Sequence, residues 1–129
     1  MLNVLLIDDD ADDRFLFGKS LQKTGLEIHY LEADGCDAAI QLMGENKYPD
    51  VIFLDINMPG GNGYDCLKKI KSNAVWRHIP VIIYSTSGNP DDVQKAANSK
   101  TAGYLKKPDD VAILSLKLKD LLRTFIIQR

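Results

Sequence analysis

Five short, mostly apolar runs, each followed by a stretch with helical spacing of apolar residues, constrain the fold more than any other feature. The runs cover residues 4–7, 28–31, 51–54, 81–84 and 102–105. Short apolar runs without strict alternation are typical of strands buried on both faces, as in a parallel sheet. Strands that alternate with helices favour right-handed crossovers, which place helices on both faces of one sheet. The sequence therefore predicts an α/β fold with a doubly wound, five-stranded parallel sheet.

The length and the short connections predict one domain. The chain has 129 residues, about the size of one domain. Five strand–helix units are too few for an eight-stranded barrel, and no linker, low-complexity tract or repeat of fixed period is visible in the sequence. We therefore expect residues 1–129 to form a single domain.

The charge and hydropathy of the chain argue against two classes of partner. Sixteen Lys and Arg against eighteen Asp and Glu give a net charge of −2, so there is no overall positive field to hold nucleic acid. No apolar run approaches the roughly 20 residues that span a bilayer, and the N-terminus lacks a signal-peptide pattern. We expect a cytoplasmic protein that binds neither nucleic acid directly nor a membrane.

The two cysteines, Cys36 and Cys66, do not form a C-x-x-C motif. A zinc site or a disulfide framework would need more cysteines or closer spacing. Because structural disulfides are rare in cytoplasmic proteins, the sequence predicts two reduced thiols in the core.

Polar side chains follow four of the five predicted strands. They are Asp8, Asp9 and Asp10 after the first, Asp55 after the third, Ser85 and Thr86 after the fourth, and Lys106 and Lys107 after the fifth. Ligands of open α/β sheets bind beyond the carboxyl ends of the strands. Carboxylates gathered there repel one another unless they bind a proton or a cation, and Mg²⁺ is a suitable cation. With a hydroxyl and a lysine beside them, they indicate phosphoryl transfer, with a carboxylate as nucleophile.

The same residues carry a resemblance to a known family. They are the acidic pair after the first strand, the segment Asp55-Ile56-Asn57-Met58-Pro59 with Gly63, Ser85 at the end of the fourth strand, and Lys107-Pro108 after the fifth. Over the whole chain, the sequence resembles the receiver domain of bacterial two-component response regulators, of the single-domain, chemotaxis-regulator type. The resemblance implies a flavodoxin-like (βα)5 fold and, at residues 1–129, a receiver domain without an output domain.

The resemblance also implies a role for each acidic residue. Asp55 would accept a phosphoryl group from a sensor histidine kinase. Asp9 would bind Mg²⁺ directly, with Mn²⁺ as an alternative ion, and Asp8 would bind it mainly through water. Asp55 would add a carboxylate oxygen to the metal, and Asn57 would add its backbone carbonyl.

Lys107, Ser85 and Tyr104 complete the implied machinery. Lys107 would pair with Asp55 and then with a phosphoryl oxygen, and the Lys107–Pro108 peptide bond would be cis. Ser85 would donate a hydrogen bond to the phosphoryl group, and Tyr104 would turn inward as the switch aromatic. Asp109 and Asp110 depart from the family pattern, which usually has an apolar residue after Lys-Pro, and we expect them to cap the last helix and to compete for Lys107.

The function implied is that of a phosphoacceptor signalling domain, not an enzyme, with at most slow self-catalysed phosphorylation and dephosphorylation. Its partners would be a sensor histidine kinase or phosphotransfer protein and a downstream protein or second copy of the chain. The downstream contact would use the fourth helix, the fifth strand and the last helix. The last helix carries more apolar residues than one buried stripe needs, among them Ile113, Leu116, Phe125, Ile126 and Ile127.

Two alternatives remain open at this stage. A haloacid-dehalogenase-like phosphatase also uses an aspartyl nucleophile and Mg²⁺, but it needs a second Asp two residues later, where this chain has Asn57. A flavodoxin-like protein that binds a flavin cofactor needs hydroxyls and glycines after the first strand, where this chain has acids.

Overall fold

A computed structural model describes residues 1–58, 63–87, 89–99 and 101–128, with side chains as far as residue 126. The strands are β1 (Leu2–Ile7), β2 (Ile28–Ala33), β3 (Val51–Leu54), β4 (Val81–Ser85) and β5 (Gly103–Lys106). The helices are α1 (Ala11–Lys23), α2 (Cys36–Gly44), α3 (Gly63–Ser72), α4 (Pro90–Asn98) and α5 (Val111–Gln128), with a 3₁₀ turn, η1, at Trp76–His78. Pro59 of the predicted signature lies outside the described residues.

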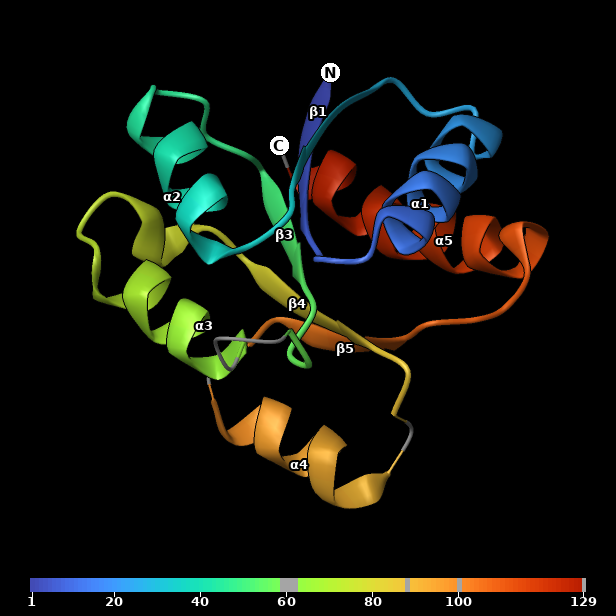
Figure 1. The fold of residues 1–129 in the computed structure, drawn as a ribbon. Coiled ribbons are helices and arrows are strands. Elements are labelled where there is room, and N and C mark those ends of the chain that lie inside the picture. Colours follow the sequence, from blue (N-terminus) through green and yellow to red (C-terminus); the bar gives the residue numbers. More distant parts are fainter. Residues whose placement is uncertain (59–62, 88, 100, 129) are drawn as a thin grey trace.

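The strands form one parallel sheet in the order β2-β1-β3-β4-β5, which confirms the predicted fold class (Figure 1). The chain runs from β1 to β2 on one side and then returns to place β3 on the other side of β1. The carboxyl ends of β1 and β3 therefore flank the point where the strand order reverses, which is the usual ligand position in such sheets.

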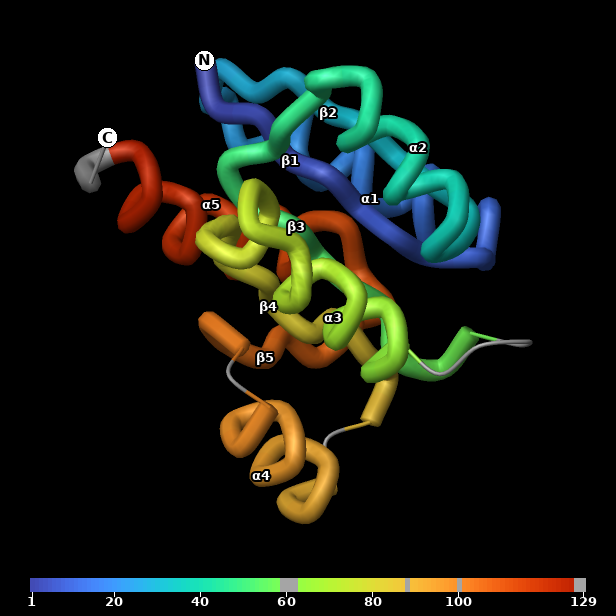
Figure 2. The backbone as a smooth tube through the Cα atoms, turned by 90° about the vertical axis from the view of Figure 1, so that its left-hand side faces the viewer, coloured from blue at the N-terminus to red at the C-terminus, as the bar shows by residue number. Residues whose placement is uncertain are grey.

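Helices cover both faces of the sheet (Figures 1 and 2). On one face, Phe17 of α1 and Leu118 of α5 are fully buried against the sheet. On the other, Met43, Ile70 and Ala96 place α2, α3 and α4 on a second apolar cluster. The continuous apolar strands follow from this arrangement, because both of their faces are covered.

Two helix starts are fixed by aspartate caps. The Asp10 carboxylate accepts hydrogen bonds from the backbone N–H groups of Asp12 and Asp13 at the start of α1. The Asp110 carboxylate accepts the backbone N–H of Ala112 at 2.6 Å at the start of α5. The expected capping role of Asp110 is confirmed, and both carboxylates satisfy backbone donors that a helix leaves unpaired.

The prediction of two reduced thiols is wrong, because Cys36 and Cys66 form a disulfide. Cys36 begins α2 and Cys66 is the fourth residue of α3, and both helices pack on the same face of the sheet. Their Cα atoms are 5.6 Å apart, within the range that a disulfide bridges. Sequence spacing did not reveal this proximity, because 30 residues and a whole strand separate the two cysteines.

The predicted cis bond between Lys107 and Pro108 is also wrong, because the described residues contain no cis peptide bond. Trans is the intrinsically favoured isomer before proline. The Lys107 backbone N–H continues the β4–β5 ladder by donating to the Ser85 carbonyl at 2.7 Å, and the flexible lysine side chain still reaches the acidic residues. Within the described part of the chain, no helix is long and apolar enough to cross a membrane.

Candidate functional site

Backbone pairing places the predicted site residues at one edge of the sheet. The Asp8 N–H donates to the Ala33 carbonyl at 3.0 Å, and the Asp55 N–H donates to the Ile7 carbonyl at 2.9 Å. Each residue therefore extends the ladder of its strand by one position. Ser85 ends β4, and Lys107 follows β5 directly.

Three of these carboxylates form a compact cluster. Oxygen atoms of Asp8, Asp9 and Asp55 lie within 4.8 Å of one another. Asp8 is fully buried and Asp55 is 5% exposed, whereas Asp9 is exposed. Hard oxygen donors on buried and exposed sides suit a divalent cation that keeps part of its water shell. The cluster could therefore hold a metal ion, as the sequence predicted.

Lys107 lies beside this cluster and forms three ion pairs. Its Nζ atom is 2.8 Å from Asp8 Oδ2, 2.8 Å from Asp13 Oδ2 and 3.4 Å from Asp55 Oδ2. Nζ also lies 5.1 Å from the centre of the Tyr84 ring, within cation–π range. The predicted pairing of Lys107 with Asp55 is present in the structure, but it is the longest of the three.

Burial and pairing shift two pKa values at the site. Burial raises the pKa of Asp8 to about 6, although the hydrogen bond from Lys107 and the Asp10 N–H partly oppose this rise. Burial alone would lower the pKa of Lys107, but hydrogen bonds to Asp13 and Asp8 and the charges of Asp8 and Asp55 outweigh it and raise that pKa. Lys107 therefore stays a cation, and Asp8 needs a positive neighbour to remain charged.

Asn57 connects Asp55 to Ser85. The Asn57 backbone N–H donates to Asp55 Oδ1 at 3.0 Å, and its side-chain amide donates to Ser85 Oγ at 3.1 Å. Ser85 Oγ also accepts the Ser87 N–H at 3.2 Å. Both bonds use oxygen lone pairs of Ser85, so its hydroxyl proton is the group it can offer to a further acceptor.

Tyr104 is linked to the same loop. It is half-buried against the apolar cluster under α3 and α4, and its hydroxyl donates to the Ser87 carbonyl. Ser87 is also bound to α4, because its hydroxyl donates to the Asp92 carboxylate at 2.5 Å. The residues predicted to act as a switch therefore contact one three-residue segment, 85–87.

Sequence reasoning missed Asp13 at the site, and it named Gly63 only as part of the family signature, without its close contact with Asp55. Asp13 lies in the first turn of α1 and binds Lys107; an acid three positions after the Asp10 cap was the available signal. Gly63 begins α3, and a Cβ atom there would lie 2.4 Å from Ile56 Cα and 2.5 Å from the Asp55 carbonyl oxygen. The start of α3 can approach Asp55 this closely only because residue 63 has no side chain.

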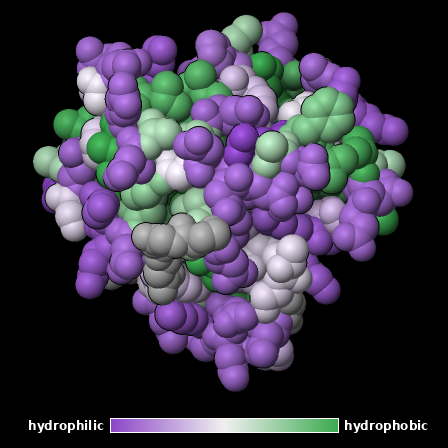
Figure 3. All heavy atoms as spheres, viewed as in Figure 1, coloured by the Kyte–Doolittle hydropathy of each residue, from purple (hydrophilic) through white to green (hydrophobic). Residues whose placement is uncertain are grey.

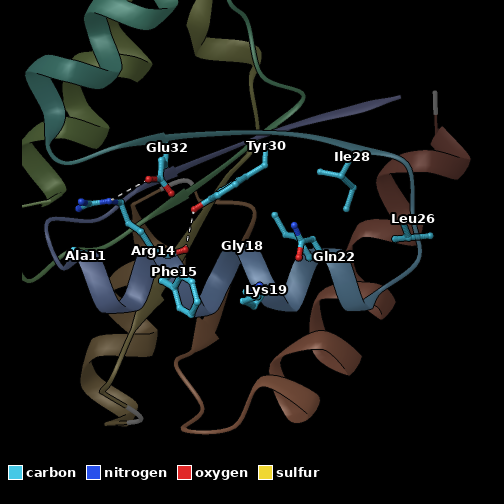
Figure 4. Close-up of a pocket in the computed structure, with 11 residues that line it drawn as sticks. Ala11, Arg14, Phe15, Gly18, Lys19, Gln22, Leu26, Ile28, Tyr30 and Glu32 are labelled. Atoms are coloured by element: carbon cyan, nitrogen blue, oxygen red, sulfur yellow. Dashed lines mark hydrogen bonds and ion pairs between the residues drawn. The ribbon is translucent and has the colours of Figure 1, made fainter.

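A separate groove of about 670 Å³ lies between α1 and the edge strand β2 (Figure 4). Its walls include Phe15, Gly18 and Tyr30, and the Tyr30 hydroxyl donates to the Arg14 carbonyl. None of the predicted site residues lines it. The acidic cluster and the groove are therefore distinct features.

Comparison with known proteins agrees with this geometry. Residues 4–119 match the family described as response regulator receiver domain. The chemotaxis protein CheY1 of Helicobacter pylori is 31% identical over 123 residues, which cover 95% of this chain and 98% of CheY1. The phosphate regulon transcriptional regulatory protein PhoB of Escherichia coli is 28% identical, but the chain spans only 51% of its length.

Two solved structures show the same fold. The Mn²⁺-bound form of response regulator Rcp1 has a TM-score of 0.78 at 27% identity, over 94% of this chain and 91% of that one. Chemotaxis response regulator CheY4 of Vibrio cholerae has a TM-score of 0.76 at 28% identity, over 95% and 98% of the two chains.

Proposed function

Because the chain belongs to the response regulator receiver domain family, we propose that Asp55 accepts a phosphoryl group from a sensor histidine kinase or phosphotransfer protein. Receiver domains of the CheY type are signalling domains, and neither the phosphatase nor the flavin-binding alternative gains support from the site or the relatives. The observation that carries the proposal is the position of Asp55. Its nearly buried carboxylate lies within reach of Lys107 and is part of the acidic cluster.

In the proposed reaction, an Asp55 carboxylate oxygen attacks the phosphorus of a phosphohistidine. A P–O bond forms, the P–N bond breaks, and its electron pair returns to the imidazole nitrogen. The product is an acyl phosphate on Asp55, which water later hydrolyses slowly to the carboxylate and inorganic phosphate. Small acyl phosphates would serve as donors in the same way, without a partner enzyme. Lys107 and the Ser85 hydroxyl would neutralise and bind the phosphoryl oxygens.

A divalent cation fits the carboxylate cluster, and Mg²⁺ is the ion we assign to it, with Mn²⁺ as a substitute. Asp9 and Asp55 would bind it directly, Asp8 mainly through water, and Asn57 through its backbone carbonyl. When bound, the cation would offset the negative charge that accumulates as an anionic group meets an anionic acceptor. The fit of the site is supported by the three carboxylate oxygens within 4.8 Å.

The signal would leave the site through Ser85 and Tyr104. In this structure Ser85 Oγ accepts a hydrogen bond from the Asn57 side chain. A phosphoryl group on Asp55 would give the Ser85 hydroxyl a charged acceptor for its own proton, and such hydrogen bonds are stronger than neutral ones. A shift of Ser85 moves the segment 85–87, to which the Tyr104 hydroxyl is bound. Tyr104 lies on β5 and contacts the cluster beneath α4, so the change would reach both elements.

We place the contact with a downstream protein or a second copy on α4, β5 and α5. Ile113 is 48% exposed and Leu116 is 67% exposed on α5, while Val93 is 39% exposed on α4. Figure 3 shows mostly hydrophilic residues over α4, at the bottom of the view. Most of the exposed apolar side chains of this surface are therefore on α5, and α4 would contribute mainly polar contacts together with Val93. A cytoplasmic location would follow from a partnership with a kinase.

The Asp55→Asn variant tests the proposal. The wild type, incubated with Mg²⁺ and acetyl phosphate, should gain the mass of one phosphoryl group and lose it on treatment with hydroxylamine, which cleaves acyl phosphates. Asp55→Asn should fold and gain nothing, because an amide is a poor nucleophile. Asp65→Asn, at an exposed carboxylate on α3, is the matched control and should behave like wild type. Phosphorylation that persists in Asp55→Asn contradicts the assignment.

A further inference from the structure

Lys107 is held by a third carboxylate, that of Asp13, and we propose that Asp13 competes with the phosphoryl group for this lysine. In this role Asp13 is a positioning residue, which lowers the occupancy of the phosphorylated state by keeping Lys107 in its resting position. The inference rests on the proposed function of Asp55, and it adds a residue that sets how readily that function proceeds.

The distances show which carboxylates accept the hydrogen bonds of the Lys107 ammonium group. An ammonium group has three donors, and the three carboxylates of Asp8, Asp13 and Asp55 take them at 2.8, 2.8 and 3.4 Å. The bond to Asp55 is the weakest by length. In the resting protein, Lys107 is therefore held mainly by Asp8 and Asp13, and less by Asp55, the proposed phosphoryl acceptor.

Asp13 is the partner that can release the lysine. The Asp8 side chain is fully buried and is also fixed by the Asp10 N–H, which donates to Asp8 Oδ1 at 3.0 Å. The Asp13 side chain is 30% exposed, so its carboxylate can turn toward water at little cost. For Lys107 to approach a phosphoryl group beyond Asp55, the bond to Asp13 is the one that opens.

Charge acts in the same direction as this competition. Phosphorylation turns the Asp55 carboxylate into a group with more negative charge, and the Asp13 carboxylate shares a cation with it. A negative charge near the phosphoryl group disfavours that group by repulsion. The single positive charge of Lys107 cannot fully neutralise both the Asp13 carboxylate and the phosphoryl group. Replacing Asp13 by a neutral amide removes both effects at once.

An acid at position 13 could also serve only to stabilise the start of α1, and the experiment has to distinguish this role from competition for Lys107. Acids in the first turn of a helix are stabilised by the helix dipole, and Asp12 and Asp13 both lie in the first turn of α1. Asp12 is exposed, and within the described residues the ion pairs of Lys107 are with Asp8, Asp13 and Asp55. Asp12→Asn is therefore a matched control with the same change of charge on the same turn.

The first measurement is the affinity for beryllofluoride, a phosphoryl analogue, at saturating Mg²⁺. Asp13→Asn should bind it about fivefold more tightly than wild type, the effect of one partly exposed ion pair. Asp12→Asn should stay within about twofold, and Asp13→Glu, which restores a carboxylate, should return toward wild type. Equal affinities of Asp13→Asn and Asp12→Asn overturn the inference. Wild-type protein that binds no beryllofluoride overturns the proposed function of Asp55 itself.

The second measurement observes the lysine directly. In protein labelled with ¹⁵N-lysine, the Lys107 amine resonance, assigned by its loss in Lys107→Met, should shift in Asp13→Asn and not in Asp12→Asn. A resonance unchanged by Asp13→Asn shows that the contact is absent and contradicts the inference. A loss of Mg²⁺ affinity in Asp13→Asn as large as that in Asp9→Asn would assign Asp13 to the metal instead.

Discussion

The Lys107 ammonium donates a 2.8 Å hydrogen bond to Asp8, which lies 99 positions earlier in the sequence. In the sheet the ends of β1 and β5 are separated by β3 and β4, so the two side chains meet above those strands. Both side chains are almost completely buried. The pairing keeps two charges out of water, and the raised pKa of Asp8 shows that Lys107 only partly offsets that burial.

The first prediction is that Asp8 makes the metal-free protein less stable as the pH rises. Its pKa is about 6 in the folded protein, against an ordinary 3.8. Between these values the folded state binds more protons than the unfolded state, so the free energy of unfolding falls with rising pH. Relative to Asp8→Asn, wild type should lose roughly 2 kcal/mol between pH 4 and pH 6. Urea unfolding with a chelator present measures this, and parallel pH profiles of the two proteins would contradict it.

The second prediction concerns Asp9. Asp9→Asn should weaken Mg²⁺ binding at least about tenfold, because it removes a charged oxygen ligand from the exposed side of the cluster. Without metal, the variant should be no less stable than wild type, since it relieves repulsion between carboxylates. Calorimetric titration is the suitable measurement. Trp76 lies in η1, before the start of β4, whereas Ser85 is at the other end of that strand, so tryptophan fluorescence is a poor reporter of Mg²⁺ binding. Equal Mg²⁺ affinity in Asp9→Asn and wild type would exclude Asp9 as a ligand.

The third prediction concerns Gly63. In Gly63→Ala the new Cβ would lie 2.5 Å or less from two backbone atoms of Asp55 and Ile56, so the start of α3 must shift. We expect a loss of about 1–3 kcal/mol in unfolding free energy and slower phosphorylation of Asp55. Gly44→Ala is the control, because a Cβ at Gly44 meets no atom within 4 Å. Wild-type stability and rate in Gly63→Ala would refute the close approach.

The fourth prediction concerns the disulfide between Cys36 and Cys66. Denatured protein kept free of reductant should show no titratable thiol, and reduction should lower the free energy of unfolding by about 3.6 kcal/mol, as expected for a loop of 30 residues. The variant with both Cys36→Ala and Cys66→Ala should be insensitive to reductant. Two free thiols in the untreated protein would show that the bond does not form in solution.

Most of the fold could be predicted because its signals are local. Each buried strand appears as a short apolar run, and the helix caps Asp10 and Asp110 lie next to the residues they bind. Leu16 and Phe17 are neighbouring apolar residues of α1, but Leu16 is 36% exposed and Phe17 is fully buried. Neighbouring positions on a helix are hard to distinguish when both are apolar.

The site residues, too, could be predicted where the signal is local and not where it depends on long-range packing. Asp8, Asp55, Ser85 and Lys107 were predictable because each follows a strand, and parallel strands bring their carboxyl ends to one edge. A competitor for Lys107 was expected from Asp109 and Asp110, but within the described residues the ion pairs of Lys107 include Asp13 and neither of these. That contact joins positions 94 residues apart, and it depends on how α1 is oriented, which no local pattern specifies.

In the proposed switch, the hydrogen bonds that join Asn57 and Tyr104 to segment 85–87 limit how strongly phosphorylation of Asp55 can change the binding of a partner. Asn57 binds Ser85 and Tyr104 binds Ser87, and hydrogen bonds of this kind each contribute about 0.5–1.5 kcal/mol. If the proposed switch acted through these two bonds alone, phosphorylation would change the affinity for a partner by roughly a hundredfold at most. A receiver with such limited coupling would give a graded rather than an all-or-none response. The abundance of its partner would then decide the phosphorylation level at which a response begins.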